Sequence, residues 1–204
     1  MNSFTYRLEE PGDYAAVEAL TREAFWNVYK PGCDEHYILH TLRGSSAVIK
    51  DLNYVCEDKG VLCGHIFYTH SKVVAEDGQV FPVITFGPIS VHPDYQKRGI
   101  GSALIKMTLK KAGDMRFPGV LITGSPAYYH RFGFRDAADY GIVSDAGFSF
   151  PELMAYELGE GRLHPAHGRL YFDPAFDNID QEELLRFDRQ FPEKERLIFP
   201  GQLQ

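Results

Sequence analysis

The residues best suited to chemistry lie in one stretch, positions 92–102, where a glycine-containing loop follows a buried strand and opens a helix. Gly99 and Gly101 let a ligand approach the backbone closely, and the first N–H groups of a helix have no partner inside it. The helix dipole is positive at that end, and Lys97 and Arg98 add further positive charge. This combination predicts a site for phosphate or pyrophosphate.

Basic residues are concentrated in the same region. The 204 residues carry 21 Lys and Arg against 28 Asp and Glu, a net charge of −7. Positions 92–113 hold five bases and one acid, a local charge of +4, so the other 182 residues carry −11. One basic segment in an acidic chain indicates one anionic ligand, and it argues against a general nucleic-acid binder.

Two other phosphate-binding motifs do not fit the loop. A P-loop has Lys followed by Ser or Thr after its second glycine, whereas Ser102-Ala103 follows Gly101. The dinucleotide fingerprint has a third glycine where Leu104 stands.

Composition predicts a soluble cytoplasmic protein. Hydrophobic residues make up 44% of the chain and charged residues 24%, which is ordinary for a globular domain. No apolar run approaches the ~18–20 residues of a membrane span, and charged residues precede any apolar stretch, so we expect no membrane segment or signal peptide. Three cysteines cannot form a full disulfide framework, and we expect reduced thiols, with Cys56 and Cys63 placed to face each other across a hairpin.

Hydrophobic periodicity predicts the elements that position the loop. Before it we expect a strand at 4–8, helices over 13–28 and 34–43, and strands at 53–57, 61–69, 71–75 and 79–83. Asp77-Gly78 predicts a type I′ hairpin turn, which needs positive φ at both residues. Positions 83–91 are apolar on both faces and predict a central strand, with a bulge or a break in pairing at Gly87-Pro88.

The elements after the loop complete a mixed α/β fold. We expect a helix over 100–113, a strand at 120–123, a short helix over 126–132, strands at 154–158 and 170–172, and a helix over 180–190. Asp180 and Glu183 form a capping-box pattern at the start of the last helix. The order predicts a single sheet of mixed direction, with one clear parallel crossover around the basic helix.

Three motifs in this order resemble the GCN5-related N-acetyltransferase (GNAT) superfamily. The Gln/Arg-x-x-Gly-x-Gly/Ala signature matches Gln96-Lys97-Arg98-Gly99-Ile100-Gly101. Before it, Ile89-Ser90-Val91-His92-Pro93 matches the end of the family's central strand, and Tyr129-His130-Arg131-Phe132-Gly133-Phe134 matches the downstream Tyr-x-x-x-Gly-Phe motif. The resemblance is greatest to a bacterial subgroup with Tyr-Tyr-x-Arg-Phe-Gly-Phe.

The resemblance implies a GNAT-type fold, a mixed and mostly antiparallel central sheet flanked by helices. Two splayed strands, the one ending at Val91 and the one at 120–123, would hold acetyl-coenzyme A (acetyl-CoA) between them. It also implies an acetyltransferase domain over 1–158, with 159–204 as a C-terminal strand and helix extension packed on the same domain.

The same resemblance implies the roles of the binding residues. Acetyl-CoA is the co-substrate, with its pyrophosphate on the loop from Arg98 to Ser102 and its pantetheine paired with the backbone of Ile89 and Val91. The Ile89 N–H would polarise the thioester carbonyl. The full set of predicted binding residues is Ile89, Val91, Gln96, Lys97, Arg98, Gly99, Ile100, Gly101 and Ser102.

Tyr129 is the predicted catalytic residue, since it matches a tyrosine that the family places beside the departing sulfur. A tyrosine hydroxyl titrates near ~10 and a thiol near ~8.5, so proton transfer to the thiolate is uphill by about 2 kcal/mol. A hydrogen bond that stabilises the thiolate is the more economical role. The alternative is that Tyr129 only packs beneath the helix, while Tyr128 points elsewhere.

The sequence identifies neither a general base nor a metal site. No carboxylate lies between Val80 and Val91. The polar candidates for a base are Thr85, Ser90, His92, His65 and His70. An amine that loses its proton to bulk water needs no base. The pairs His36/His40 and His164/His167 lack a third ligand at metal spacing, so we expect no metal.

We therefore predict an acetyl-CoA-dependent N-acetyltransferase acting on a primary amine of a small molecule or peptide. The alternatives are a non-catalytic acyl-CoA-binding module that acts through a partner, and a nucleotide-binding protein of another fold. In the family the first two helices usually wall the acceptor pocket, so Trp26 and its aromatic neighbours are candidates for that wall or for the core. The tail from Asp180 is open to three roles: covering that pocket, packing on the sheet, or forming a homodimer.

Overall fold

Hydrogen bonds join nine strands into one sheet in the structure, a computed structural model that describes residues 4–202. The strands are β1 (Thr5–Leu8), β2 (Tyr54–Asp58), β3 (Val61–Val74), β4 (Val80–Val91), β5 (Gly119–Thr123), β6 (Arg135–Asp136), β7 (Ile142–Val143), β8 (Leu153–Glu157) and β9 (Gly168–Tyr171). Their order is β1-β2-β3-β4-β5-β8-β6, with β9 pairing both β3 and β7.

Both parallel and antiparallel pairs occur in this sheet. β4 pairs with β5 in parallel, with Ile84 opposite Val120, and β7 pairs with β9 in parallel. The pairs β1–β2, β2–β3, β3–β9, β5–β8 and β6–β8 are antiparallel. The helices are α1 (Tyr14–Phe25), α2 (Glu35–Leu42), α3 (Ile100–Asp114), α4 (Pro126–Tyr129) and α5 (Gln181–Asp188). The predicted mixed, mostly antiparallel α/β fold is confirmed.

The chain divides into two compact units. The first comprises residues 1–67, 88–104 and 174–204, and the second comprises residues 68–87 and 105–173. Strands β3 and β4 and helix α3 therefore contribute residues to both units. The predicted boundary between residues 158 and 159 stays a prediction.

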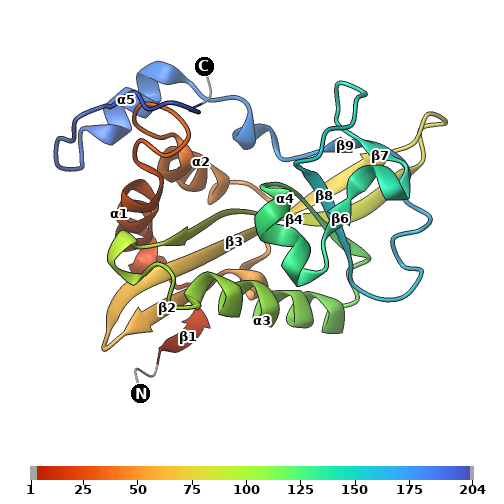
Figure 1. Ribbon diagram of the computed structural model, residues 1–204, viewed down its shortest axis with the longest axis horizontal. Helices are drawn as coiled ribbons and strands as arrows, with labels where there is room; N and C mark the ends of the chain where they lie inside the picture. Colours follow the sequence, from red (N-terminus) through yellow and green to blue (C-terminus); the bar gives the residue numbers. More distant parts are fainter. Residues whose placement is uncertain (1–3, 203–204) are drawn as a thin grey trace. The chain divides into compact units, whose positions relative to one another are not determined.

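In the first unit, α1 and α2 bury their apolar stripes against β2 and β3. Val17 of α1, Leu39 and Leu42 of α2, Val55 of β2 and Phe67 of β3 form one buried cluster. Leu39 and Leu42 stand three residues apart, so both side chains lie on the same face of α2. Figure 1 shows α5, from the far end of the chain, beside α1 and α2.

The start of α3 packs closely on β3, also within the first unit. A Cβ placed on Gly64 would lie 2.6 Å from Ile100 Cγ2 and 3.4 Å from Leu104 Cδ1. Ile100 and Leu104 are 1% and 0% exposed. A glycine at position 64 is therefore what lets the first turn of the helix approach the strand.

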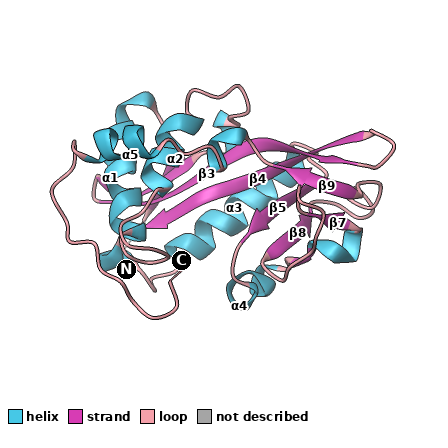
Figure 2. Cartoon of the chain, turned by 90° about the horizontal axis from the view of Figure 1, so that it is seen from above, coloured by secondary structure: helices cyan, strands magenta, loops and turns pink. Residues whose placement is uncertain are grey.

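In the second unit, β5 pairs along its whole length with β8, from Gly119 opposite Glu157 to Thr123 opposite Leu153. Figure 2 shows β7, β8 and β9 gathered near β5. The buried cluster here includes Leu121, Leu153 and Leu170 from three of these strands. The two-residue strands β6 and β7 have no counterpart in the predicted elements, because so short a segment carries no periodicity.

The structure corrects one turn and joins two pairs of predicted strands. The predicted strands 61–69 and 71–75 form the single strand β3, and those at 79–83 and 83–91 form the single strand β4. The type I′ turn predicted at Asp77-Gly78 is wrong, because only Gly78 has positive φ, 86°. Asp77 instead accepts a hydrogen bond from Gln79 N–H at 2.9 Å through its carboxylate, an arrangement that a short acidic side chain favours. Positive φ at both central residues occurs at the other hairpin, at Lys59 (52°) and Gly60 (83°).

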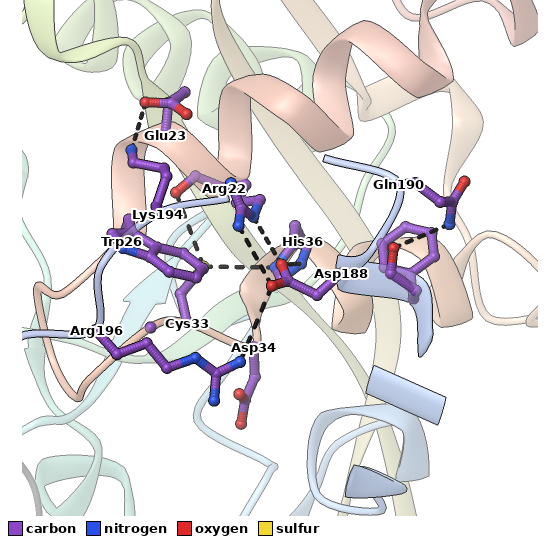
Figure 3. A network of polar contacts seen from close by, with 12 residues as sticks. Arg22, Glu23, Trp26, Cys33, Asp34, His36, Asp188, Gln190, Lys194 and Arg196 are labelled. Carbon is purple, nitrogen blue, oxygen red and sulfur yellow. Dashed lines mark hydrogen bonds and ion pairs between the residues drawn. The ribbon is translucent and has the colours of Figure 1, made fainter. Parts of the chain in front are cut away.

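The C-terminal segment of the first unit is fastened to α1 and α2 through Asp188, at the end of α5 (Figure 3). Arg22 of α1 donates to both carboxylate oxygens, at 2.7 and 3.3 Å. His36 Nε2 of α2 lies 3.1 Å from the same carboxylate, and His36 Nδ1 lies 3.4 Å from Cys33 Sγ. Arg22 is 2% exposed and His36 is 0% exposed. One carboxylate therefore neutralises a buried guanidinium and ties three helices together.

The surroundings of this group shift two pKa values. Burial lowers the pKa of His36 to about 4, although the charge of Asp188 acts in the opposite direction. Burial alone would raise the pKa of Asp188, but its hydrogen bonds to Arg22 and His36 outweigh that effect and hold the pKa below its ordinary value. At neutral pH the group therefore contains a neutral imidazole beside an ionised Arg–Asp pair.

Asn27, just after α1, fastens the chain beyond α5. Its Nδ2 donates to Glu195 O at 2.9 Å, and its Oδ1 accepts from Leu197 N–H at 3.1 Å. Its backbone oxygen accepts from Gln202 Nε2 at 2.8 Å. Asn27 holds this position with a φ of 59°, which asparagine tolerates better than most residues. The chain beyond α5 therefore packs along the turn between α1 and α2. The three roles predicted for the tail stay predictions.

Gly64→Ala should destabilise the protein by about 1–3 kcal/mol, because the added methyl group overlaps Ile100 and forces the start of α3 away from β3. Gly12→Ala is the matched control, since a Cβ at Gly12 meets nothing within 4 Å. Urea unfolding of the two variants beside the wild type measures the difference. Equal unfolding midpoints for all three proteins would contradict the close approach.

Stability should fall as the pH is lowered from 6.5 to 4. In that range the unfolded chain protonates His36, whose ordinary pKa is ~6.5, whereas the folded chain, with a pKa of about 4, does not. At ~1.4 kcal/mol per pKa unit, the loss is about 3 kcal/mol.

His36→Gln should flatten this dependence while keeping an amide donor for Asp188. Chemical unfolding at pH 7, 5.5 and 4 compares the variant with the wild type, and His167→Gln, at an exposed position, is the control. Parallel stability curves for wild type and His36→Gln would rule out the buried neutral imidazole.

Candidate functional site

The loop after β4 is tied to the sheet at its start. His92 N–H donates to Cys63 O at 3.0 Å, which keeps the end of β4 on β3. A single 3-10 turn follows at Pro93–Tyr95. The side-chain amide of Gln96 donates to Val91 O at 3.3 Å and closes the loop back on the strand. Gln96, one of the predicted binding residues, therefore uses its side chain to stabilise the loop.

Left-handed backbone at two positions turns the loop into α3. The φ angle is 61° at Lys97 and 85° at Gly99. A positive φ is unusual for a residue with a Cβ such as Lys97. Ala103 N–H donates the first helical hydrogen bond to Gly99 O, at 2.9 Å. The N–H groups of Ile100 and Gly101 precede that bond and have no acceptor inside the helix. Alternating backbone conformations at the positive end of a helix form a concavity suited to an anion.

The side chains of the loop divide into an anchor and an exposed basic pair. Ile100 is buried and holds the helix start on the sheet, whereas Lys97 and Arg98 are exposed. The Arg98 guanidinium lies 4.9 Å from the centre of the Tyr95 ring, which supports it. The predicted residues from Gln96 to Ser102 thus lie together in one loop and one helical turn. Tyr95 was not among the predicted binding residues, although an aromatic residue three positions before an arginine was a signal for such stacking.

At the end of β4, the Ser90 side chain contacts α1. Ser90 Oγ donates to Thr21 Oγ1 of α1 at 3.0 Å, and both side chains are fully buried. Because side chains alternate along a strand, Ile89 and Val91 direct their side chains away from α1. Both are partly buried. Val91 O already accepts from Gln96, and a carbonyl oxygen has a second lone pair for another donor.

Tyr129 lies in the second unit, at the end of α4. Its ring rests on Gly124, where a Cβ would stand 2.4 Å from Tyr129 Cε2. The rings of Phe86 and Phe134 lie 5.9 and 5.6 Å from it, centre to centre. The Tyr128 ring lies 5.0 Å from the Tyr129 ring, and the Arg131 guanidinium lies 3.9 Å from the Tyr128 ring centre. The Tyr129 ring is therefore held by aromatic packing, and its catalytic role stays a prediction.

The polar candidates for a general base have different surroundings. Thr85 Oγ1 donates to Leu121 O at 2.5 Å. The His70 ring packs on the ring of Phe117, with centres 5.7 Å apart. Ser90 Oγ donates to Thr21, as described above, and His92 Nδ1, just after β4, accepts from Asp94 N–H at 3.3 Å.

His65 belongs to a buried charged group. Its ring is 0% exposed, with Nε2 3.3 Å from Glu9 Oε1, and Arg43 lies 2.5 Å from the same carboxylate oxygen. Burial lowers the pKa of His65, although Glu9 acts in the opposite direction. Burial would raise the pKa of Glu9, but His65 and Arg43 outweigh it and lower that pKa. This group joins the residue after β1, the residue after α2 and the strand β3.

Other predictions about binding groups concern the histidines, the cysteines and the membrane. His36 faces Asp188, whereas His40 lies 2.9 Å from Glu18, so the two histidines do not converge. Residues 4–202 contain no group of three His, Cys, Asp or Glu side chains placed to hold a metal ion. The thiols of Cys56 and Cys63 are free and 3.7 Å apart. Within the same residues, no helix is long and apolar enough to cross a membrane.

Comparison with known proteins gives one family. The model of the acetyltransferase (GNAT) domain matches residues 5–137. The uncharacterized N-acetyltransferase YhbS of Escherichia coli K12 is 27% identical over 173 residues, which cover 85% of this chain and 98% of that protein.

Solved structures agree with the sequence comparison. The crystal structure of E. coli YhbS in complex with CoA has a TM-score of 0.77 at 22% identity and covers 88% of this chain and 95% of its own. A GNAT family acetyltransferase from Brucella melitensis in complex with acetyl-CoA has a TM-score of 0.69 at 26% identity, covering 87% of this chain and all of its own. Since the family model matches well over half of its residues, this chain belongs to the GNAT acetyltransferase family.

Proposed function

We propose that the protein is an acetyl-CoA-dependent N-acetyltransferase that moves the acetyl group directly to a primary amine of a small molecule or peptide. Membership of an acetyltransferase family supports the reaction class, and the acetyl-CoA complex of the Brucella relative supports the co-substrate. The observation that supports the proposal is the loop from Lys97 to Gly101, where left-handed backbone leads into the start of α3, whose first N–H groups suit an anion.

In this proposal the loop binds the pyrophosphate of acetyl-CoA. The N–H groups of Ile100 and Gly101 donate to phosphate oxygens, and Ser102 completes the first helical turn. Lys97 and Arg98 are exposed beside these groups and add two positive charges. Charge-assisted hydrogen bonds of this kind are roughly twice as strong as neutral ones, so they account for most of the orientation of the ligand.

The proposed reaction is one displacement at the thioester carbon. The nitrogen lone pair of the neutral amine forms the new C–N bond, and the C–S bond then breaks to release CoA as a thiolate. The Ile89 N–H donates to the carbonyl oxygen as negative charge develops on it. The amine proton passes to water, and Tyr129 donates a hydrogen bond to the departing sulfur. This division of roles requires no dedicated general base.

The experiment that tests the proposed function measures thiol release from acetyl-CoA with a panel of amines, amino acids, polyamines and peptide N-termini. Release above the hydrolysis background, matched by an equal amount of N-acetylated product, is the expected result. Tight acetyl-CoA binding without release for any acceptor would instead favour a non-catalytic binding module.

Gly101→Glu should weaken acetyl-CoA binding at least about 100-fold, which corresponds to about 3 kcal/mol. The side chain fills the concavity and places a negative charge against the pyrophosphate. Isothermal titration calorimetry gives the dissociation constant, and Gly12→Glu adds the same side chain at a position with no neighbour within 4 Å. Wild-type affinity in Gly101→Glu would remove the loop from the binding site.

Tyr129→Phe should lower kcat about 10-fold while leaving the KM for acetyl-CoA within a factor of two. The substitution removes only the hydroxyl, so the packing on Phe86, Phe134 and Gly124 is kept. A neutral hydrogen bond contributes ~1 kcal/mol and one to a charged group ~1.5–3 kcal/mol. Steady-state kinetics with Tyr128→Phe as the control make the measurement. Unchanged turnover would show that Tyr129 has only a packing role.

A further inference from the structure

A cavity of about 710 Å³ lies between α1 and the C-terminal segment, entirely within the first unit. Eight of its ten lining residues come from positions 185–196, and the other two are Arg22 and Trp26 of the α1 region. The cavity therefore depends on the tail being docked, and Asp188 and Asn27 are the residues that dock it. Nothing in the proposed binding of acetyl-CoA uses this cavity.

Some of the charges around the cavity are already neutralised. Arg22 is paired with Asp188 at 2.7 Å, and Lys194 is paired with Glu23 at 2.7 Å. Arg196 is 3.9 Å from Asp188, a carboxylate that already accepts two hydrogen bonds from Arg22. Most of the N–H donors of the Arg196 guanidinium therefore have no close acceptor in the described part of the chain.

Three further charged side chains line the cavity: Arg189, Glu193 and Glu195. Each is exposed, and none has an ion-pair partner among residues 4–202. Together with Arg196, they leave two guanidiniums and two carboxylates available in one concave space. Charges of both signs suit a ligand that itself carries both signs. A phosphate dianion would meet the two carboxylates as like charges.

The Trp26 ring supports two of these guanidiniums. Arg22 and Arg196 lie 4.1 and 5.8 Å from its ring centre, and its indole N–H donates to Glu195 O at 2.9 Å. Figure 3 shows the indole between Arg196 and Arg22. A guanidinium that is held over an aromatic ring loses less conformational freedom when it binds a carboxylate.

The same helix connects this cavity to the strand proposed to hold the thioester. Thr21 contacts Ser90 of β4 at 3.0 Å, and Arg22, the next residue, lines the cavity. Ser90 lies between Ile89 and Val91, whose backbone groups are the proposed partners of the pantetheine. Helix α1 therefore fixes the cavity and this part of β4 to one rigid element of the first unit.

We propose that this cavity binds the acceptor, and that the acceptor carries a carboxylate in addition to its amine, as an amino acid or a short peptide does. Arg189 and Arg196 bind the carboxylate, since a guanidinium matches its two oxygens with two parallel donors. Glu193 and Glu195 attract the positively charged amine from solution. This inference rests on the proposed N-acetyltransferase function and specifies its substrate class.

The test compares acceptors that differ only by the carboxylate. Phenylalanine is paired with phenethylamine, γ-aminobutyrate with propylamine, and lysine with cadaverine, and kcat/KM is measured by thiol release. In at least one pair, the carboxylate-bearing member should be preferred at least about 10-fold, mainly through a lower KM. A preference for the simple amine in every active pair would overturn the proposal.

Paired variants connect that preference to the cavity. The double variant Arg189→Gln, Arg196→Gln should lose at least about 10-fold in kcat/KM for the preferred acceptor, with the KM for acetyl-CoA unchanged. Arg186→Gln, within α5 but outside the cavity, is the control. A matching thermal unfolding midpoint shows that the tail remains docked in the double variant. An equal loss for both members of a pair would contradict recognition of the carboxylate.

Failure of the proposed function remains distinguishable from failure of this inference. If no amine releases thiol, the same six compounds are titrated into ¹⁵N-labelled protein and followed by NMR. Shifts of the Trp26 indole resonance with the carboxylate-bearing compounds, lost in the double variant, would support the cavity. No shift with any of them would overturn it.

Discussion

The site depends on how closely α3 approaches β3 at the end of β4. Ile100 packs where Gly64 has no side chain, and this contact fixes the position of the first helical turn. The N–H groups of that turn have no acceptor inside the helix, so their direction is set by the packing beneath them. The amides of Ile100 and Gly101 can therefore face a ligand, because the buried Ile100 side chain holds the start of α3 on the sheet.

A second constraint acts from the other side of β4. Helix α1 contacts Ser90 through Thr21, and its next residue, Arg22, is held by Asp188 from the end of α5. A buried guanidinium would be strongly destabilising without a partner, so the docking of α5 and the placement of α1 depend on each other. The C-terminal segment is thus a structural part of the first unit, and it forms most of the lining of the cavity.

Local sequence signals predicted β4, the loop that follows it and α3, because each is encoded within about 20 neighbouring residues. The same is true of the Asp180 N-cap, which accepts from Glu182 and Glu183 N–H groups. The Arg22–Asp188 pair joins residues 166 positions apart, and no local pattern indicates such a contact. The sequence offers no pairing for His36 either, because its partner on α5 is equally remote along the chain.

Backbone conformation was harder to predict than the elements themselves. Lys97 takes a left-handed φ that its residue type does not favour, while Asp77 avoids the one predicted for it. In both cases a hydrogen-bonding neighbour competes with intrinsic preference: Gln96 ties the loop to Val91, and Gln79 donates to Asp77. The left-handed backbone at Lys97 is therefore the feature of this loop that the sequence predicts least well.

The central claim is that the loop between β4 and α3 holds the pyrophosphate of acetyl-CoA through its backbone. The most direct measurement is an NMR titration of ¹⁵N-labelled protein with acetyl-CoA, followed at the amides of residues 98–102. Saturable shifts of these resonances, with the same dissociation constant as the ligand shows by calorimetry, are the expected result. Saturating binding that leaves these amides unchanged would contradict the account.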